Sequence, residues 1–243
     1  MNITHHWKRF LAVGCSHGYL SDGDALEAVL RFKRLWKPHT VIHLGDCFDT
    51  TAFMKDGAAA GQGGPKPIKP DLDSGHEFLR QLRPNVFCCG NHEDRLWRLA
   101  SHRNEIVATL AQSIITGIQT ICDGMGCEIL PWEYKQAFHI GNFKFFHGTI
   151  FTESCARDTA EARGNCVFAH AHRASMATGR RDDCPTGICV GHLMREDLAD
   201  YAKARKSTYA WSRGFCWGVY HQDRLVPWLH VQPQGQKEWV LPI

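Results

Sequence analysis

Residues 11–18 read "LAVGCSHG", an apolar run that ends in glycine and is followed by a cysteine and a histidine two positions apart. A short apolar run bounded by glycine is typical of a buried β-strand. Cysteine and histidine are both ligands that transition metals accept in proteins. The stretch therefore predicts a strand whose carboxyl end carries Cys15 and His17 as candidate metal ligands.

The residues that follow complete a strand–helix–strand unit. Residues 24–36 place apolar side chains at roughly helical spacing among charged ones, and residues 41–44 form a second apolar run. This alternation favours a parallel sheet. A third run, Val86–Cys89, precedes "GNHED", and the stretch "HEDRLWRLASHRNEI" predicts one helix with acids in its first turn.

The remaining chain contains a long irregular interval and a C-terminal hairpin. Residues 54–76 are rich in Gly, Ala and Pro without periodicity, which predicts a surface loop beside the strand ends, with a disordered insertion as the alternative. "GFCWGVY" and "LVPWLHV" flank "HQDR" and predict a hairpin. No repeat or linker interrupts the pattern, so residues 1–243 are expected to form a single domain.

Composition narrows the class of protein. Of 243 residues, 44% are hydrophobic and 22% charged, as in ordinary globular proteins, and a net charge of +3 does not support a large footprint on duplex nucleic acid. The eleven cysteines form no Cys-x-x-Cys pair, which argues against a zinc ribbon. Without a signal peptide or an apolar run approaching transmembrane length, we expect a cytoplasmic protein with mostly buried thiols and no membrane partner.

Five apolar runs end in metal-competent residues. One such histidine would be weak evidence, but the carboxyl ends of strands are where open α/β sheets build their sites, so five together are informative. The five groups are Cys15-x-His17, Asp46-x-x-Asp49, Asn91-His92, His147 and His170-x-His172.

In these motifs the chain resembles the calcineurin-like metallophosphoesterases, particularly compact phage and bacterial members. The family pattern of D-x-H, G-D-x-x-D, G-N-H-[ED], an isolated H and G-H-x-H occurs here in order as "CSH", "GDCFD", "GNHE", "FFHG" and "AHAH". The motifs span residues 15–172. Cys15 stands where the family has its first aspartate, and Ala169 replaces a glycine, a mild change wherever positive φ is not required.

The resemblance implies a fold and a ligand set. The fold is a mixed α/β architecture in which two β-sheets form a sandwich flanked by helices, in four αββα layers. The cofactors would be two divalent transition-metal ions, Mn, Fe or Zn, with Zn or Fe favoured beside a sulfur ligand. One ion would be held by Cys15, His17, Asp46 and His172, and the other by Asp46, Asn91, His147 and His170.

The resemblance also implies a reaction. His92 would be the catalytic residue that protonates the leaving oxygen, and a carboxylate at Asp49 would orient it. We expect a phosphodiesterase using a metal-bridging hydroxide, with nucleotides and nucleic acids among the candidate substrates and the host cytoplasm as the compartment if a phage encodes it. The alternatives are a phosphomonoesterase, a nuclease, or a regulatory module impaired by Cys15, whose thiol would then be a bystander.

Several residues near the motifs have two readings. Arginines could contact phosphate or be solvated charges, lysines could line a substrate channel or only solubilise a loop, and tryptophans of the tail could stack bases, although core packing is favoured. These residues are Arg95, Arg98, Arg173, Lys55, Lys66, Lys69, Trp211, Trp217, Trp228 and Trp239; His5, His6, His102 and His192 are expected to be structural or on the surface.

Overall fold

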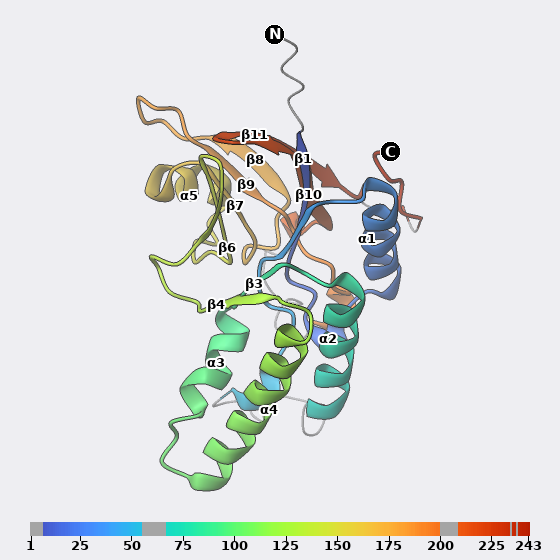
Figure 1. The fold of residues 1–243 in the computed structure, drawn as a ribbon, viewed down its shortest axis with the longest axis vertical. Helices are drawn as coiled ribbons and strands as arrows, with labels where there is room; N and C mark the ends of the chain where they lie inside the picture. The colour runs from blue at the N-terminus through green and yellow to red at the C-terminus, as the bar shows by residue number, and fades with distance from the viewer. Residues whose placement is uncertain (1–6, 55–66, 200–208, 234, 237) are drawn as a thin grey trace.

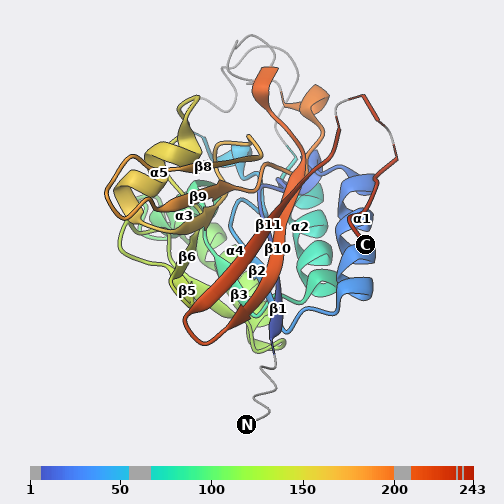
Figure 2. The same ribbon diagram turned by 90° about the horizontal axis from the view of Figure 1, so that it is seen from above.

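Two β-sheets lie face to face with helices on their outer sides (Figure 1). The computed structural model describes residues 7–54, 67–199, 209–233, 235–236 and 238–243. Seen from above, α1 and α2 lie on one side of the paired sheets and α5 on the other (Figure 2). The structure therefore has the mixed α/β sandwich flanked by helices that the sequence predicted.

The first sheet has six strands in the order β11-β10-β1-β2-β3-β4. Its strands β1 to β4 are parallel, whereas β10 and β11 form an antiparallel hairpin beside β1, as predicted from the tail. The bounds are β1 (Lys8–Val13), β2 (Thr40–His43), β3 (Val86–Cys88), β4 (Glu128–Leu130), β10 (Gly214–His221) and β11 (Arg224–Val231).

The second sheet has five strands in the order β5-β6-β7-β9-β8. Strands β6, β7 and β9 are parallel, and the edge strands β5 and β8 run antiparallel to their neighbours. The bounds are β5 (Phe138–Ile140), β6 (Phe143–Phe146), β7 (Cys166–Phe168), β8 (Ser175–Thr178) and β9 (Thr186–Cys189).

Five α-helices cover the outer faces. Helix α1 is capped by Asp22, whose carboxylate accepts the N–H groups of Asp24 and Ala25, the usual way of satisfying a helix start. The helices are α1 (Gly23–Trp36), α2 (Ile68–Leu82), α3 (Asn91–Leu99), α4 (Glu105–Asp123) and α5 (Cys155–Arg163), with short 3₁₀ turns η1 (Gly18–Leu20), η2 (Thr51–Phe53) and η3 (Glu196–Leu198).

The core has three apolar layers. Between the sheets, Phe10 and Ile42 of the first sheet belong to one buried cluster with Phe145 and Val167 of the second. A larger cluster joins the outer face of the first sheet to α1, α2 and α4, and a smaller one lies between the second sheet and α5. Each fully buried large apolar side chain contributes about 1.5–3 kcal/mol, so these layers stabilise the packing of both sheets.

Two local predictions were wrong. The interval 54–76 is not one loop, because α2 begins at Ile68, while residues 55–66 lie outside the described part of the chain. Pro70 falls in the first turn of α2, where proline is tolerated. The single helix expected from residue 92 is two helices, because Asn104 caps a new start by accepting the N–H groups of Ile106 and Val107.

Helix α4 is long and apolar. It has 19 residues, and by length and composition alone it could cross a membrane. A core helix passes the same test, and α4 is amphipathic. Its buried face carries Ala111, Ile114, Ile115 and Ile118, and its exposed face Gln112, Thr116 and Gln119.

Candidate metal centre

The carboxyl ends of five strands meet at one edge of the sandwich and bring the predicted residues together. Parallel strands of one sheet end at the same edge, and here both sheets contribute to it. Cys15 and His17 follow β1, Asp46 follows β2, Asn91 follows β3, His147 follows β6, and His170 and His172 follow β7. The structure thus assembles all seven residues that the resemblance implies as metal ligands.

Four of these residues form a closed cluster. Cys15, His17, Asp46 and His172 are all buried, and the metal-competent atoms of the four lie within 4.8 Å of one another. His17 Nε2 is 3.0 Å from His172 Nε2 and 3.8 Å from Asp46 Oδ2. A sulfur, two imidazoles and a carboxylate form a donor set suited to zinc or iron.

A second cluster shares Asp46. The metal-competent atoms of Asp46, His147 and His170 also lie within 4.8 Å of one another. Asn91 Oδ1 is 2.9 Å from His170 Nδ1 and 3.1 Å from His147 Nε2, so the amide joins this group. Burial raises the pKa of Asp46, but the imidazoles of His147 and His92 outweigh it and hold that pKa well below its usual range.

The acceptor atoms of the second cluster need a positively charged group between them. His147 Nδ1 lies 2.7 Å from the carbonyl oxygen of Leu44, to which it donates, so the lone pair of the neutral ring is at Nε2. That nitrogen faces Asp46 Oδ2 at 3.2 Å and Asn91 Oδ1 at 3.1 Å. Three acceptors converge there, which is stable only with a proton or a metal ion between them. The residues present therefore fit a metal ion.

The Cys15 sulfur is positioned as a ligand would be. It is fully buried and accepts the backbone N–H of His170 at 3.3 Å. Burial and the charge of Asp46 raise the pKa of this thiol, so the thiolate forms only when a cation lies nearby. The second departure from the family pattern is harmless, because Ala169 is not among the described residues with positive φ.

The backbone of the centre is strained. Ten described residues other than glycine have positive φ, and five of them are proposed ligands: Cys15, His17, Asp46, His170 and His172. Such conformations cost about 1–3 kcal/mol each and persist only where the surroundings determine them. Half of the described non-glycine residues with positive φ therefore belong to this one edge of the sandwich.

Two buried carboxylates hold the loop that carries Asp46. Glu93 accepts the N–H groups of Asp46, Cys47 and Phe48 at 2.7–3.1 Å, and it also accepts that of Gly90 at 2.7 Å. Burial and the charge of Asp46 raise the pKa of Glu93, and these bonds to the charged form act against that rise.

Asp71 of α2 completes this support. Its two oxygens accept the N–H groups of Asp49 and Thr50, each at 2.8 Å. Five consecutive N–H groups, from residue 46 to residue 50, are thus bound by two side chains. Gly18 is required nearby, because a Cβ there would lie 1.7 Å from Asp71 Oδ1. Sequence reasoning missed Asp71, which it had assigned to a loop.

His92 and Asp49 lie at the edge shared by both clusters. His92 Nδ1 donates to the carbonyl oxygen of Asp49, and its Nε2 is 4.0 Å from Asp46 Oδ2. Asp49 Oδ1 is 3.3 Å from His17 Nδ1 and 3.7 Å from His92 Nδ1, so the carboxylate stands between the two rings. Burial lowers the pKa of His92, and Asp46 opposes this.

The arginines singled out from sequence have different surroundings. Arg95 donates to the carbonyl oxygens of Asp49 and Thr50, and Arg98 is exposed and pairs with Asp94. Arg173 is buried and donates to the carbonyl oxygen of Thr152.

Of the other candidates, two lie on the surface, one is buried, and four lie outside the described residues. Lys69 is exposed and pairs with Asp73, while Lys55, Lys66, His5 and His6 lie outside the described residues. His102 is exposed, and its ring accepts the N–H of Asn104. His192 is fully buried, with its ring 5.6 Å from that of His172.

The tail tryptophans mostly pack against other rings, as favoured from sequence. Trp217 contacts Trp36 and Trp228, and Trp239 stacks on Phe215. Trp211 differs in its partner, because its ring lies 4.5 Å from that of His172 at the metal centre.

Comparison with known proteins yields phage relatives. No family model matches the chain. It is 25% identical to the gene 54 protein of Mycobacterium phage L5 over 244 residues, covering 90% of this chain and 93% of the relative. It is likewise 25% identical to the gene 54 protein of Mycobacterium phage D29 over 224 residues, covering 86% and 87%.

Solved structures that resemble this chain include a Vps29 and a bacterial phosphoesterase. Vps29 of Entamoeba histolytica matches with a TM-score of 0.47 and 11% identity, covering 93% of this chain and 94% of that one. The phosphoesterase YfcE of E. coli matches with a TM-score of 0.39 and 14% identity, covering 90% and 96%. Similarity this distant carries no argument alone, so functional inference rests on the side chains of the centre.

Proposed function

We propose that this chain is a calcineurin-like metallophosphoesterase that hydrolyses phosphoesters, with diesters as its preferred substrates. The observation that carries the proposal is the convergence of five strand ends on Asp46, whose Oδ2 lies 3.2 Å from His147 Nε2 and 3.8 Å from His17 Nε2. A carboxylate between two groups of imidazoles can serve two cations at once.

The two clusters would divide the metal ions between them. Cys15, His17, Asp46 and His172 would hold one ion, and Asp46, Asn91, His147 and His170 the other. When bound, such a pair polarises a phosphoryl oxygen and makes hydroxide available near neutral pH. Sulfur and imidazole favour Zn or Fe in the first cluster, whereas Mn, Fe or Zn suit the second.

His92 would supply the proton. A carbonyl oxygen only accepts, so the Nδ1 of His92 keeps its proton against Asp49, and Nε2 is the atom that exchanges one. In the reaction the protonated ring gives the Nε2 proton to the departing ester oxygen and becomes neutral. Transfer by a positioned acid contributes roughly 10²–10⁴-fold. Asp49 would orient His92 through its backbone carbonyl rather than through the carboxylate expected from sequence, and the carboxylate would orient His17 instead.

The preference for diesters has one structural support. Arg95, Arg98 and Arg173, the sequence candidates for phosphate contacts, are all engaged: Arg95 and Arg173 by backbone carbonyls and Arg98 by Asp94. None of these three guanidinium groups is held ready for the second negative charge that a monoester carries and a diester lacks. The similarity to two mycobacteriophage proteins further supports a phage origin, with the host cytoplasm as the place of action.

The test is an assay of bis(p-nitrophenyl) phosphate and p-nitrophenyl phosphate with protein loaded with Zn²⁺, Fe²⁺ or Mn²⁺. We expect the diester to be hydrolysed faster, chelator to stop the reaction and added metal to restore it. Faster hydrolysis of the monoester would overturn the diester preference only. Full activity in protein that has been stripped of metal and treated with chelator would overturn the proposal of a metal-dependent phosphoesterase. The absence of hydrolysis with any of the metals would overturn it as well.

A further inference from the structure

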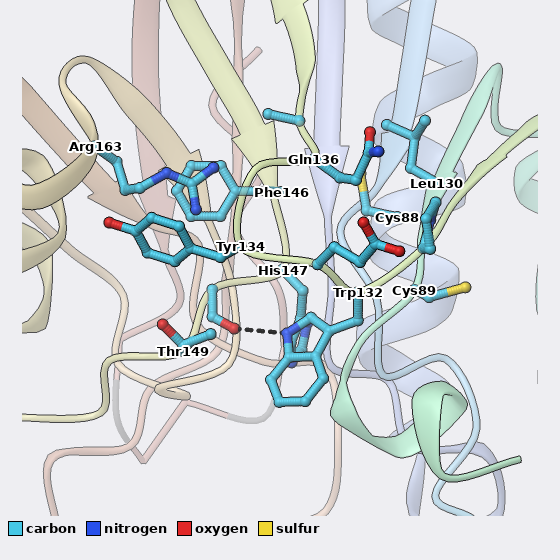
Figure 3. A pocket seen from close by; sticks show the side chains of 14 residues that line it. Cys88, Cys89, Leu130, Trp132, Tyr134, Gln136, Phe146, His147, Thr149 and Arg163 are labelled. Atoms are coloured by element: carbon cyan, nitrogen blue, oxygen red, sulfur yellow. Dashed lines mark hydrogen bonds between the residues drawn. The ribbon is translucent and has the colours of Figure 1, made fainter. Parts of the chain in front are cut away.

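A pocket of about 200 Å³ lies beside the metal centre (Figure 3). Its lining comes from the carboxyl ends of β3, β4 and β6, from the connection 131–137 and from the end of α5. Strands β3 and β6 are the ones followed by Asn91 and His147, and His147 itself lines the pocket. The pocket and the centre therefore share a side chain and open at the same edge of the sandwich.

Aromatic side chains form the walls of this pocket. Trp132 lies next to His147 in Figure 3, and its Nε1–H donates to the carbonyl oxygen of Gly148 at 3.0 Å. That bond fixes the indole against the residue that directly follows His147. Opposite lies Tyr134, whereas the nearby Phe146 ring is already packed on the Arg163 guanidinium and on Phe168, so the flat faces left for a guest are those of Trp132 and Tyr134. Flat apolar walls favour a flat guest, because rings gain from offset stacking beyond their buried area.

The pocket also offers polar groups at its rim. The Arg163 guanidinium lies 4.2 Å from the centroid of Phe146 and 4.6 Å from that of Tyr134. Within the described part of the chain Arg163 has no carboxylate partner at ion-pair distance, so its N–H groups can serve acceptors of a guest. Thr149 and Gln136 add a hydroxyl and an amide to the lining. These groups suit a ring that carries oxygen or nitrogen acceptors at its edge.

We propose that this pocket binds a flat ring carried by one ester group of the substrate while the phosphate lies at the metal centre. The proposal rests on the proposed function and names the substrate class: phosphoesters of a planar ring, either a nucleobase on its sugar or an aryl group. The size supports one ring system, because the volume is below the roughly 300–1,000 Å³ of sites for larger ligands. Trp132 and Arg163 then determine specificity.

The first experiment compares phenylphosphonate with methylphosphonate, two anions that share a phosphonate and differ by the ring. Each is used as an inhibitor of hydrolysis of one diester by zinc-loaded protein. We expect phenylphosphonate to inhibit more tightly by roughly 5–150-fold, the range that stacking on an aromatic side chain supports. Trp132→Ala should remove most of that difference and leave inhibition by methylphosphonate unchanged, and Trp132→Phe should restore part of it.

The matched control is Trp228→Ala on β11, an exposed tryptophan that lines none of this pocket. It should change neither inhibition constant. Thymidine 5′-monophosphate is the third inhibitor. If it binds more tightly than phenylphosphonate, the preferred ring is a nucleobase, and if it binds more weakly, the preferred ring is an aryl group. Equal inhibition by the phenyl and methyl compounds, or no effect of Trp132→Ala, would overturn the proposal.

A second measurement does not depend on turnover. The indole N–H resonance of Trp132 can be assigned by its loss in Trp132→Phe and followed while phenylphosphonate is added to zinc-loaded protein. We expect it to shift with saturation, whereas methylphosphonate leaves it in place. If the resonance shifts in protein that hydrolyses no phosphoester, the ring-binding pocket is supported and the proposed phosphoesterase function is refuted. If the resonance does not move in protein that is active, the phosphoesterase function stands and the ring-binding pocket is refuted.

Discussion

The two clusters of the metal centre are built differently although they share Asp46. In the first cluster Cys15, His17, Asp46 and His172 are all buried, and all four adopt positive φ. In the second, His170 is only partly buried, Asn91 begins α3 and His147 directly follows β6, with positive φ confined to Asp46 and His170. The first is a closed site on strained loops, and the second is a more open site on regular elements.

This difference suggests that the two metal ions have different roles. A closed site without access for solvent suits an ion that stays bound, and a sulfur ligand suits the same purpose because it binds zinc or iron strongly. The more open site adjoins the aromatic pocket through His147, and His92 lies next to Asp46, which both clusters share. We therefore expect substrate to meet the second cluster, and substitutions to separate the two clusters by their effects.

The largest effect should come from the residue that the clusters share. Asp46→Asn removes the negative charge next to both groups of imidazoles, so we expect both ions to be lost and turnover to fall further than in any variant below. Metal content by atomic spectroscopy checks this, with His92→Ala as the control that keeps its metals. Loss of a single ion from Asp46→Asn would show that Asp46 serves one cluster only.

His92→Ala should come next. Loss of a general acid lowers turnover by roughly 10²–10⁴-fold, and by less for a substrate whose leaving group needs no proton. The metal content should be unchanged, because His92 belongs to neither proposed ligand set and its Nδ1 is already bound to the carbonyl oxygen of Asp49. Rates for alkyl and nitrophenyl esters of one phosphate measure the difference. If the variant loses its metals, His92 is a ligand and its assigned role is wrong.

The support of the Asp46 loop should have a smaller effect, on metal affinity. Asp71→Asn replaces one of the two oxygens that accept the N–H groups of Asp49 and Thr50, leaving a buried donor unpaired at a cost of about 1–3 kcal/mol. We expect metal affinity to fall by roughly 10–100-fold, as for other groups that orient ligands. Competition with a chelator measures it.

The same helix offers the control. Asp73→Asn on α2 removes an exposed carboxylate that pairs only with Lys69 in the described contacts, and it should change neither affinity nor melting temperature. Equal affinities in the Asp71 and Asp73 variants would show that the loop keeps its shape without Asp71.

The ends of strands were predictable because each carries its signal locally. An apolar run followed by glycine and a metal-competent residue occurs at Cys15, Asp46 and Asn91 alike, and parallel strands must end at one edge. A parallel sheet with these residues at its edge and the C-terminal hairpin could therefore be predicted from the pattern, whereas the two-sheet sandwich and the ligand set were implied only by the resemblance to the metallophosphoesterases.

The supporting residues could not be predicted in the same way. Asp71 is 25 residues from Asp46 and lies in a stretch whose Gly and Pro content masks the start of α2. The role of Asp71 depends on which backbone N–H groups face it, and sequence patterns do not contain that information. Trp132 and Arg163 likewise line one pocket only after the chain has folded, and no sequence pattern links them. The tryptophans that the sequence singled out were those of the tail.

The central claim is that the closed cluster binds its ion through sulfur, and Cys15→Asp tests it with the smallest change. An aspartate keeps the negative charge, so this variant should bind two ions, stay within roughly tenfold of the wild-type rate and shift its preference toward Mn²⁺. Cys15→Ser and Cys15→Ala should instead lose most of one ion.

X-ray absorption at the zinc edge of zinc-loaded protein measures the claim most directly. The wild type should show a sulfur neighbour at about 2.3 Å, and Cys15→Asp should show only nitrogen and oxygen neighbours at about 2.0–2.2 Å. Sulfur that persists in Cys15→Asp would come from another thiol, such as the exposed Cys184. That result, or a wild type without a sulfur neighbour, would contradict the account and leave Cys15 a buried bystander.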